Sequence, residues 1–263
     1  MKRLVVDRVT IKRGARVVID ELSISVDAGE IVGLVGANGC GKSTLLSCIA
    51  GVLAPHDGRV EIVSWSQSDT PASDGHETRA SVWGSSKQRA SARRAMGYVP
   101  EGADPPGFLR AEELWALCAS SRGVEPPRLG VRSSLAREDK RAGSTSIEAS
   151  RAREERATDG VLETLATSLG LDEIASLTLD KMSLGQRRRA CLGAAFLGPP
   201  ALLVLDEPDN GLDAKRLAAL VELVQAHAAS GGATILASHD AGWLDQLGAR
   251  RVVLDGARNE LTD

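Results

Sequence analysis

A nine-residue glycine-rich stretch constrains the fold of this chain more than any other feature. It fits the pattern G-x-x-x-x-G-K-S and ends in threonine, with an apolar run at residues 31–35 before it and a helix-forming run at residues 45–50 after it. Glycines let the backbone curl so that successive N–H groups point inward, beside a helix N-terminus that favours anions. Strand, loop and helix together predict a phosphate cradle in an α/β fold. The candidate nucleotide contacts are Gly36, Asn38, Gly39, Cys40, Gly41, Lys42, Ser43 and Thr44.

Two side chains of this loop have predicted roles. Lys42 supplies a cation at the β- and γ-phosphates, and the hydroxyl of Ser43 supplies a ligand for Mg²⁺. The alternative is a glycine-rich turn that contains Lys-Ser by chance, but the flanking strand and helix patterns count against it. By itself the loop indicates nucleotide binding and does not say what the nucleotide is used for.

Composition excludes several classes of protein. The chain has 263 residues, 43% hydrophobic and 25% charged, which suits one large soluble α/β domain or two small ones. A net charge of −3 gives no basic signature, so we expect no nucleic-acid partner. The four cysteines are scattered without a C-x-x-C pair, which favours a reducing cytoplasm over a zinc site or a disulfide framework. The most apolar window, residues 190–205, contains two prolines and is too short to span a membrane.

Two segments interrupt the pattern of apolar strands and helices. Residues 64–95 are rich in serine and show no persistent apolar period, so we expect a flexible excursion from the sheet. Residues 128–157 mix both charges and contain no aromatic residue, which predicts a largely solvated or disordered insertion. Between them, residues 111–119 suit an amphipathic helix. Trp65 and Trp83 lie in the first segment, where a tryptophan more often anchors a loop than binds a ligand.

Polar side chains follow two buried strands near the C-terminus. Residues 201–205 lead into Asp206 and Glu207, and residues 234–237 lead into His239. The carboxyl ends of parallel strands are where open α/β sheets bind ligands. We therefore expect Asp206 to hold Mg²⁺ through its water, Glu207 to polarise an attacking water and His239 to contact the γ-phosphate. An acidic strand cap and an ordinary surface histidine are the alternatives.

The sequence predicts a second helix N-terminus ahead of these two strands. Ser183, Leu184, Gly185 and Gln186 lead into an arginine-rich helix with an apolar face, expected at residues 187–197. Ser183 is a natural N-cap and Gly185 allows close approach of the backbone. This helix end is therefore also suited to receive a phosphate.

The order of these motifs resembles that of the ATP-binding cassette (ABC) ATPases, over nearly the whole chain except the two interrupting segments. The phosphate loop alone is shared with kinases, GTPases and helicases, whereas the serine-glycine-glutamine signature ahead of the Asp-Glu strand is specific to ABC proteins. The resemblance implies an α/β P-loop NTPase in a single cassette domain, residues 1–263. It has a RecA-like core, an N-terminal antiparallel β-subdomain and a helical subdomain at about residues 100–197. The motifs are Gly36–Thr44, Gly97–Glu101, Ser183–Gln186, Leu205–Pro208, Asn210–Asp213 and Ser238–Asp240.

The resemblance also implies a mechanism and its partners. ATP and Mg²⁺ bind between two cassettes in a head-to-tail dimer, so Ser183, Gly185 and Gln186 of one cassette act on the ATP of the other. Hydrolysis then uses Glu207 as base and His239 at the γ-phosphate. The second cassette is a copy of this chain or a paralogue.

Four positions depart from the usual family pattern. Glu101, in the loop that senses Mg²⁺, water and the membrane partner, replaces a common glutamine, but its carboxylate can still ligate Mg²⁺. Leu184 replaces the first of two signature glycines, while Gly185 remains. Arg13 stands about where the family stacks an aromatic residue on adenine, and its guanidinium plane is the expected substitute. Asp209 replaces a common threonine, with no clear consequence.

Two functions remain open from the sequence. The leading hypothesis is the ATPase subunit of a bacterial-type ABC transporter, bound peripherally to the cytoplasmic face of the inner membrane. It would act through a separate permease, with export favoured over import. The alternative is a soluble ABC ATPase of translation or DNA repair, although such proteins usually carry two cassettes or a long coiled-coil insertion. A small-molecule P-loop kinase fits neither the signature nor His239.

Overall fold

The computed structural model describes residues 1–66, 76–124 and 167–255. The chain divides into two compact units: the first unit is Met1–Ala103 with Pro199–Asp263, and the second unit is Asp104–Gly198. The helical subdomain expected at about residues 100–197 falls in nearly the same range as the second unit, and the domain assignment stays a prediction. The insertion expected at residues 128–157 lies outside the described residues.

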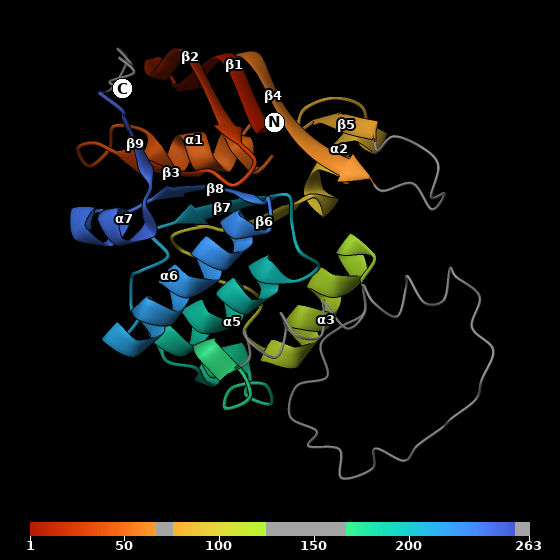
Figure 1. The fold of residues 1–263 in the computed structure, drawn as a ribbon, viewed down its shortest axis with the longest axis vertical. Helices are drawn as coiled ribbons and strands as arrows, with labels where there is room; N and C mark the ends of the chain where they lie inside the picture. Colours follow the sequence, from red (N-terminus) through yellow and green to blue (C-terminus); the bar gives the residue numbers. More distant parts are fainter. Residues whose placement is uncertain (67–75, 125–166, 256–263) are drawn as a thin grey trace, which may run out of the picture. The chain divides into compact units, whose positions relative to one another are not determined.

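The first unit contains an antiparallel sheet in the order β2-β1-β4-β5 (Figure 1). In β1 the residues Leu4 and Val6 point inward, and then Val9 and Ile11 do. The alternation shifts by one residue at Arg8, where the register is irregular and φ is +46°. A bulge of this kind lets one long strand keep its apolar side chains on the core face. The strands are β1 (Lys2–Arg13), β2 (Arg16–Asp27), β4 (Asp57–Ser66) and β5 (His76–Ser81).

The same unit contains a parallel sheet in the order β6-β7-β8-β3-β9 (Figure 1). Every residue of β7 and β8 is buried, as expected for central strands of a parallel sheet. The antiparallel sheet and the parallel core together confirm the predicted cassette architecture. The strands are β3 (Ile31–Val35), β6 (Met96–Val99), β7 (Leu202–Asp206), β8 (Ala233–Ala237) and β9 (Arg250–Val253).

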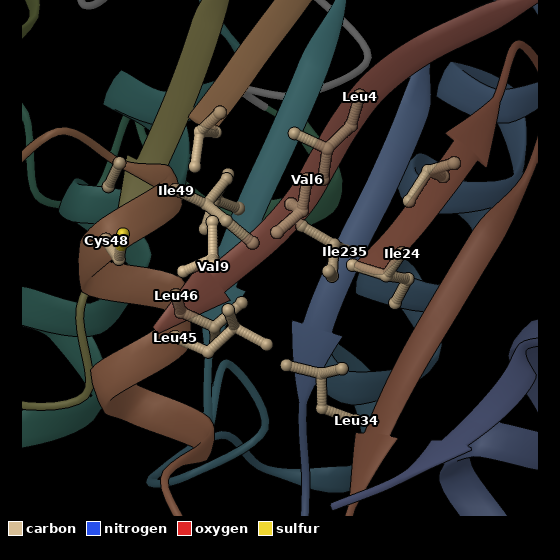
Figure 2. Packing of buried hydrophobic residues seen from close by; sticks show 14 of the residues in the cluster. Leu4, Val6, Val9, Ile24, Leu34, Leu45, Leu46, Cys48, Ile49 and Ile235 are labelled. Carbon is tan, nitrogen blue, oxygen red and sulfur yellow. The ribbon is translucent and has the colours of Figure 1, made fainter. Parts of the chain in front are cut away.

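Helix α1 (Lys42–Ile49) joins the two sheets of the first unit into one core. Figure 2 shows its side chains beside those of β1, β2, β3 and β8. Burying each such aliphatic side chain contributes about 1.5–3 kcal/mol, so this core fixes the helix that follows the phosphate loop. The labelled residues are Leu4, Val6, Val9, Ile24, Leu34, Leu45, Leu46, Cys48, Ile49 and Ile235. The other helices of this unit are α2 (Ser86–Arg94), α6 (Ala214–Ala229) and α7 (Ala241–Leu247).

The expectation of a flexible excursion at residues 64–95 is wrong for most of that segment. Strand β4 continues to Ser66, β5 pairs with it, and α2 begins with a capping box between Ser85 and Gln88. Trp83 anchors the loop between β5 and α2, because its Nε1 donates to the carbonyl of Cys48 at 3.2 Å. An edge strand and a polar helix lack the apolar period on which the expectation relied. Residues 67–75 lie outside the described residues.

The second unit contains α3 (Ala111–Arg122), the short helix η1 (Leu179–Lys181) and α5 (Leu184–Phe196). The helix predicted at residues 111–119 is confirmed, but its buried face consists of Ala111, Trp115 and Ala119, and Leu117 is exposed. Trp115 donates from Nε1 to the carbonyl of Ala190 at 2.8 Å and so ties α3 to α5. Helix α5 begins three residues before the predicted start at residue 187. No helix in the described part of the chain is long and apolar enough to cross a membrane.

Candidate nucleotide site

A cleft of about 300 Å³ opens in the first unit beside the N-terminus of α1. The phosphate loop forms one side of it, and the segments that follow β6, β7 and β8 form the other. The parallel sheet brings these segments together, because β6, β7, β8 and β3 all end at the same edge. The lining residues are Asn38, Gly39, Gly41, Lys42, Ser43, Thr44, Glu101, Glu207 and His239.

Glycine is required at two positions of the loop for steric reasons. Gly36 has φ of +150°, and a Cβ there would collide with the carbonyl oxygen of Leu254. Gly41 has φ of +114°, and a Cβ there would lie 2.9 Å from Cδ1 of Ile19. Neither Gly36 nor Cys40 lines the cleft, and the side chain of Cys40 belongs to the core. Both residues thus help to shape and seat the loop, and their contact with the nucleotide stays a prediction.

Lys42 places a positive charge at the floor of the cleft. Its Nζ donates to the carbonyls of Gly36 at 2.9 Å and Ala37 at 3.4 Å, and the residue is buried. Helix α1 starts from Gly41 and has no side-chain cap. The first backbone N–H groups of a helix have no acceptor within it. A phosphate at this position would accept from them and pair with the lysine.

Ser43 lines the cleft and contacts Asp206, which does not line it. The Ser43 hydroxyl donates to Oδ1 of Asp206 at 3.1 Å, and Asp206 is the buried last residue of β7. Hydroxyl and carboxylate oxygens are the hard ligands that Mg²⁺ prefers, completed by substrate phosphates and water. Glu101 lines the same cleft. Within the described residues, no group of three or more His, Cys, Asp and Glu side chains could hold a metal ion. The oxygen donors of Ser43, Asp206 and Glu101 fit Mg²⁺ with phosphates and water as its remaining ligands.

Glu207 and His239, which both line the cleft, form a pair. Nε2 of His239 lies 3.0 Å from Oε1 of Glu207, and the backbone N–H of His239 donates to Oε2 at 3.3 Å. Glu207 adopts a left-handed φ of +48°, uncommon outside glycine, and its N–H donates to the carbonyl of Ala237 at 3.0 Å. Burial raises the pKa of the Glu207 carboxyl, the charge of His239 opposes this, and Asp209 adds to it.

The signature lies in the second unit, at the start of α5. Ser183 is the N-cap, as predicted: its Oγ accepts from the N–H of Gln186 at 3.3 Å. Gln186 closes the capping box, because its Oε1 accepts from the N–H of Ser183 at 2.9 Å. Gly185 stands between them in the first turn, and Leu184 is 72% exposed. The signature turn is thus a complete local structure in the free chain.

Arg13 and Asp209, two positions that depart from the usual family pattern, lie outside the lining of the cleft. Arg13 is exposed at the end of β1, opposite Arg16 in the hairpin, and does not line the cleft. Its stacking on adenine stays a prediction. Sequence reasoning also missed the contact between Asp209 and Ser238, whose Oγ donates to Oδ2 of Asp209 at 3.0 Å. The only available signal was that Asp209 departs from a common threonine.

The chain matches the family model described as "ABC transporter" over residues 19–210. A putative ABC transporter ATP-binding protein of Brucella suis is 30% identical, covering 95% of this chain and 85% of the relative. The cytochrome c biogenesis ATP-binding export protein CcmA of Novosphingobium aromaticivorans is 29% identical, with 90% and 88% covered. The Nod factor export ATP-binding protein I of Bradyrhizobium diazoefficiens is 28% identical, with 97% and 69% covered.

Solved structures of cassettes share the fold. The ATP-binding subunit of an ABC transporter matches with a TM-score of 0.69 at 24% identity, covering 96% of this chain and 85% of that one. A bacterial ABC transporter cassette solved as a dimer matches with a TM-score of 0.67 at 22% identity, with 98% of both chains covered. The family match spans the phosphate loop, the signature and the Asp-Glu strand end, which are the motifs gathered above. The chain belongs to the ABC transporter family, as an ATP-binding subunit that hydrolyses ATP.

Proposed function

We propose that this chain drives export through a separate membrane permease, to which it binds at the cytoplasmic face of the inner membrane. The observation that carries the proposal is that Lys42, Ser43, Glu207 and His239 line one cleft and that Ser43 is bonded to Asp206. Export is supported by relatives whose names describe export ATP-binding proteins for cytochrome c biogenesis and for Nod factor. Substrate choice belongs to the permease.

In this proposal the cleft residues divide the work of hydrolysis. Lys42 and the first N–H groups of α1 hold the β- and γ-phosphates. Ser43, Asp206 and Glu101 hold Mg²⁺, which neutralises phosphate charge when bound. Glu207 takes a proton from the attacking water while the oxygen of that water forms a bond to the γ-phosphorus. The bond from the γ-phosphorus to the bridging oxygen breaks, and ADP leaves with that oxygen. His239 orients Glu207 and contacts the γ-phosphate.

A second cassette completes the site in this proposal. The N-terminus of α5 carries Ser183, Gly185 and Gln186, and they contact the γ-phosphate of the ATP that the other cassette holds. The helix start is suited to this role because Gly185 leaves room for close backbone approach and the helix dipole favours an anion. The dimeric form of a cassette with the same fold supports this arrangement. The second cassette is a copy of this chain or a paralogue.

Purification from membranes tests the proposal. The chain, tagged and expressed in its native host, is extracted with a mild detergent, and its partners are identified by mass spectrometry. We expect a stoichiometric complex with a protein of several membrane spans, and ATP turnover that the Glu207→Gln variant of the same complex lacks. Retention on ribosomes or DNA, with no membrane protein in the complex, would overturn the proposal in favour of a soluble ABC ATPase.

A further inference from the structure

The carboxylate of Asp209, close to the Glu207–His239 pair, holds the loop that carries His239. Asp209 accepts a hydrogen bond at Oδ2 from the hydroxyl of Ser238, at 3.0 Å. The same hydroxyl oxygen accepts from the backbone N–H of Asp240, also at 3.0 Å. A hydroxyl has one proton to donate. Because that proton is directed to Asp209, the lone pairs of the Ser238 hydroxyl are left for the N–H of Asp240. The carboxylate of Asp209 therefore fixes the position of the Ser238 side chain.

These contacts hold the backbone on both sides of His239. Ser238 directly precedes it and is only 3% exposed. Asp240 directly follows it and caps α7, because its Oδ1 accepts from the N–H of Trp243 at 3.0 Å. A continuous chain of hydrogen bonds therefore runs from Asp209 through Ser238 and Asp240 into α7.

The position of Asp209 is itself fixed relative to Glu207. The N–H of Asn210 donates to the carbonyl of Glu207 at 3.2 Å and closes a turn over residues 207–210. The end of this turn is thus tied to the loop after β8 at two places. One tie is the Glu207–His239 contact, and the other is the Asp209–Ser238 bond.

The histidine needs such a support because its own packing does not hold it. The His239 side chain is 57% exposed, while that of Glu207 is 5% exposed. An exposed ring keeps a fixed distance to a buried carboxylate only if its backbone is held. Oδ1 of Asp209 is buried and has no hydrogen-bond partner in the described part of the chain. A buried acceptor without a partner lowers the stability of the fold, so stability alone does not explain a carboxylate at this position.

We propose that Asp209 is a positioning residue for ATP hydrolysis, which acts through Ser238 to hold His239 against Glu207. The inference rests on the role of Glu207 and His239 in the proposed function. Asp209 and Ser238 do not line the cleft. Their loss should therefore slow the hydrolytic step and leave nucleotide binding unchanged.

Steady-state ATPase kinetics on the purified chain test this inference. For Asp209→Ala we expect kcat to fall about tenfold, since small misplacements of reacting groups cost one to two orders of magnitude. The KM and the dissociation constant for ATP should stay within about twofold. Ser238→Ala breaks the same bond and also the one from Asp240, so its loss should be at least as large. The double variant should lose no more than Ser238→Ala alone, because the bond between Asp209 and Ser238 can be lost only once. Asp209→Asn keeps an acceptor oxygen for Ser238 and should restore most of kcat.

A control variant and a folding check distinguish a positioning role of Asp209 from a folding defect, and Glu207→Gln tests the proposed function separately. Asp245→Ala removes a more exposed aspartate of α7 and its contact with Arg251, and it should leave kcat unchanged. Circular dichroism establishes that every variant is folded, and Ser238→Ala, which also breaks the bond to Asp209, serves as the test if Asp209→Ala does not fold. An unchanged kcat for Asp209→Ala, or additive losses in the double variant, would overturn the inference. Turnover that persists in Glu207→Gln would instead overturn the proposed function.

Discussion

The two helix N-termini that carry the nucleotide motifs are built in opposite ways. Helix α1 starts from Gly41 without any side-chain cap. Helix α5 starts from Ser183 with a capping box in which Ser183 and Gln186 satisfy each other's backbone N–H groups. The N-terminus of α1 carries no cap from its own side chains, whereas that of α5 is partly satisfied by its own chain.

The difference follows from what holds each helix. Helix α1 does not need a local cap, because Leu45, Leu46 and Ile49 are fully buried in the core that both sheets share. The start of α5 has no comparable support: Leu184 is 72% exposed there, and the capping box stabilises the first turn. We infer that α1 supplies ATP binding in the free chain. Helix α5 contributes only when it meets the nucleotide of another cassette.

The largest effect, a loss of ATP affinity, is expected from a substitution in α1. Replacing Lys42 with alanine removes the buried ammonium at the floor of the cleft. Hydrogen bonds to a charged partner contribute about 1.5–3 kcal/mol, so ATP affinity should fall at least about tenfold, measured by titration calorimetry. Lys215→Ala, which removes an exposed lysine of α6, is the matched control and should bind ATP normally. Equal affinity in the two variants would remove Lys42 from the site.

A smaller effect should separate the two helix starts. Ser183→Ala removes the N-cap of α5, which costs helices about 1 kcal/mol, so hydrogen exchange at the first amides of α5 should become faster. ATP affinity of the free chain should not change, whereas turnover should fall, because in the proposed function the signature acts on the partner's nucleotide. A loss of ATP affinity in the free chain as large as that of Lys42→Ala would contradict this division of roles.

The smallest effect should come from Leu184. Because its side chain is exposed, Leu184→Ala should change the free energy of unfolding by no more than about 0.5 kcal/mol, measured by urea denaturation. Leu192, fully buried in the same helix, is the matched control, and its replacement with alanine should cost about 2–5 kcal/mol. A large destabilisation by Leu184→Ala would mean that this helix start depends on packing, as α1 does.

Much of the site could be predicted because its determinants are local. The phosphate loop combines a short pattern with a strand before it and a helix after it. Parallel strands end at one edge of a sheet, so Asp206, Glu207 and His239 could be placed together from two short stretches. Ser183 could be identified as an N-cap from its residue type and the helix that follows.

Most of the parts that escaped prediction depend on contacts between distant segments. Residues 76–94 form an edge strand and a polar helix whose support comes from β4 and from the contact of Trp83 with Cys48. The start of α5 was placed too late because its hydrogen-bonded turn precedes its apolar period. The bond from Ser238 to Asp209 joins residues of two different loops, and no local pattern encodes it.

One measurement tests most directly whether a second cassette completes the ATP site. The Glu207→Gln variant keeps the cradle for ATP and lacks the base, so it should accumulate the ATP-bound pair. Light scattering on this variant should give the mass of one chain without nucleotide and of two chains with ATP and Mg²⁺, and Ser183→Ala added to it should weaken the pair. A variant that stays monomeric with ATP bound, while the wild-type chain hydrolyses ATP by itself, would contradict the account.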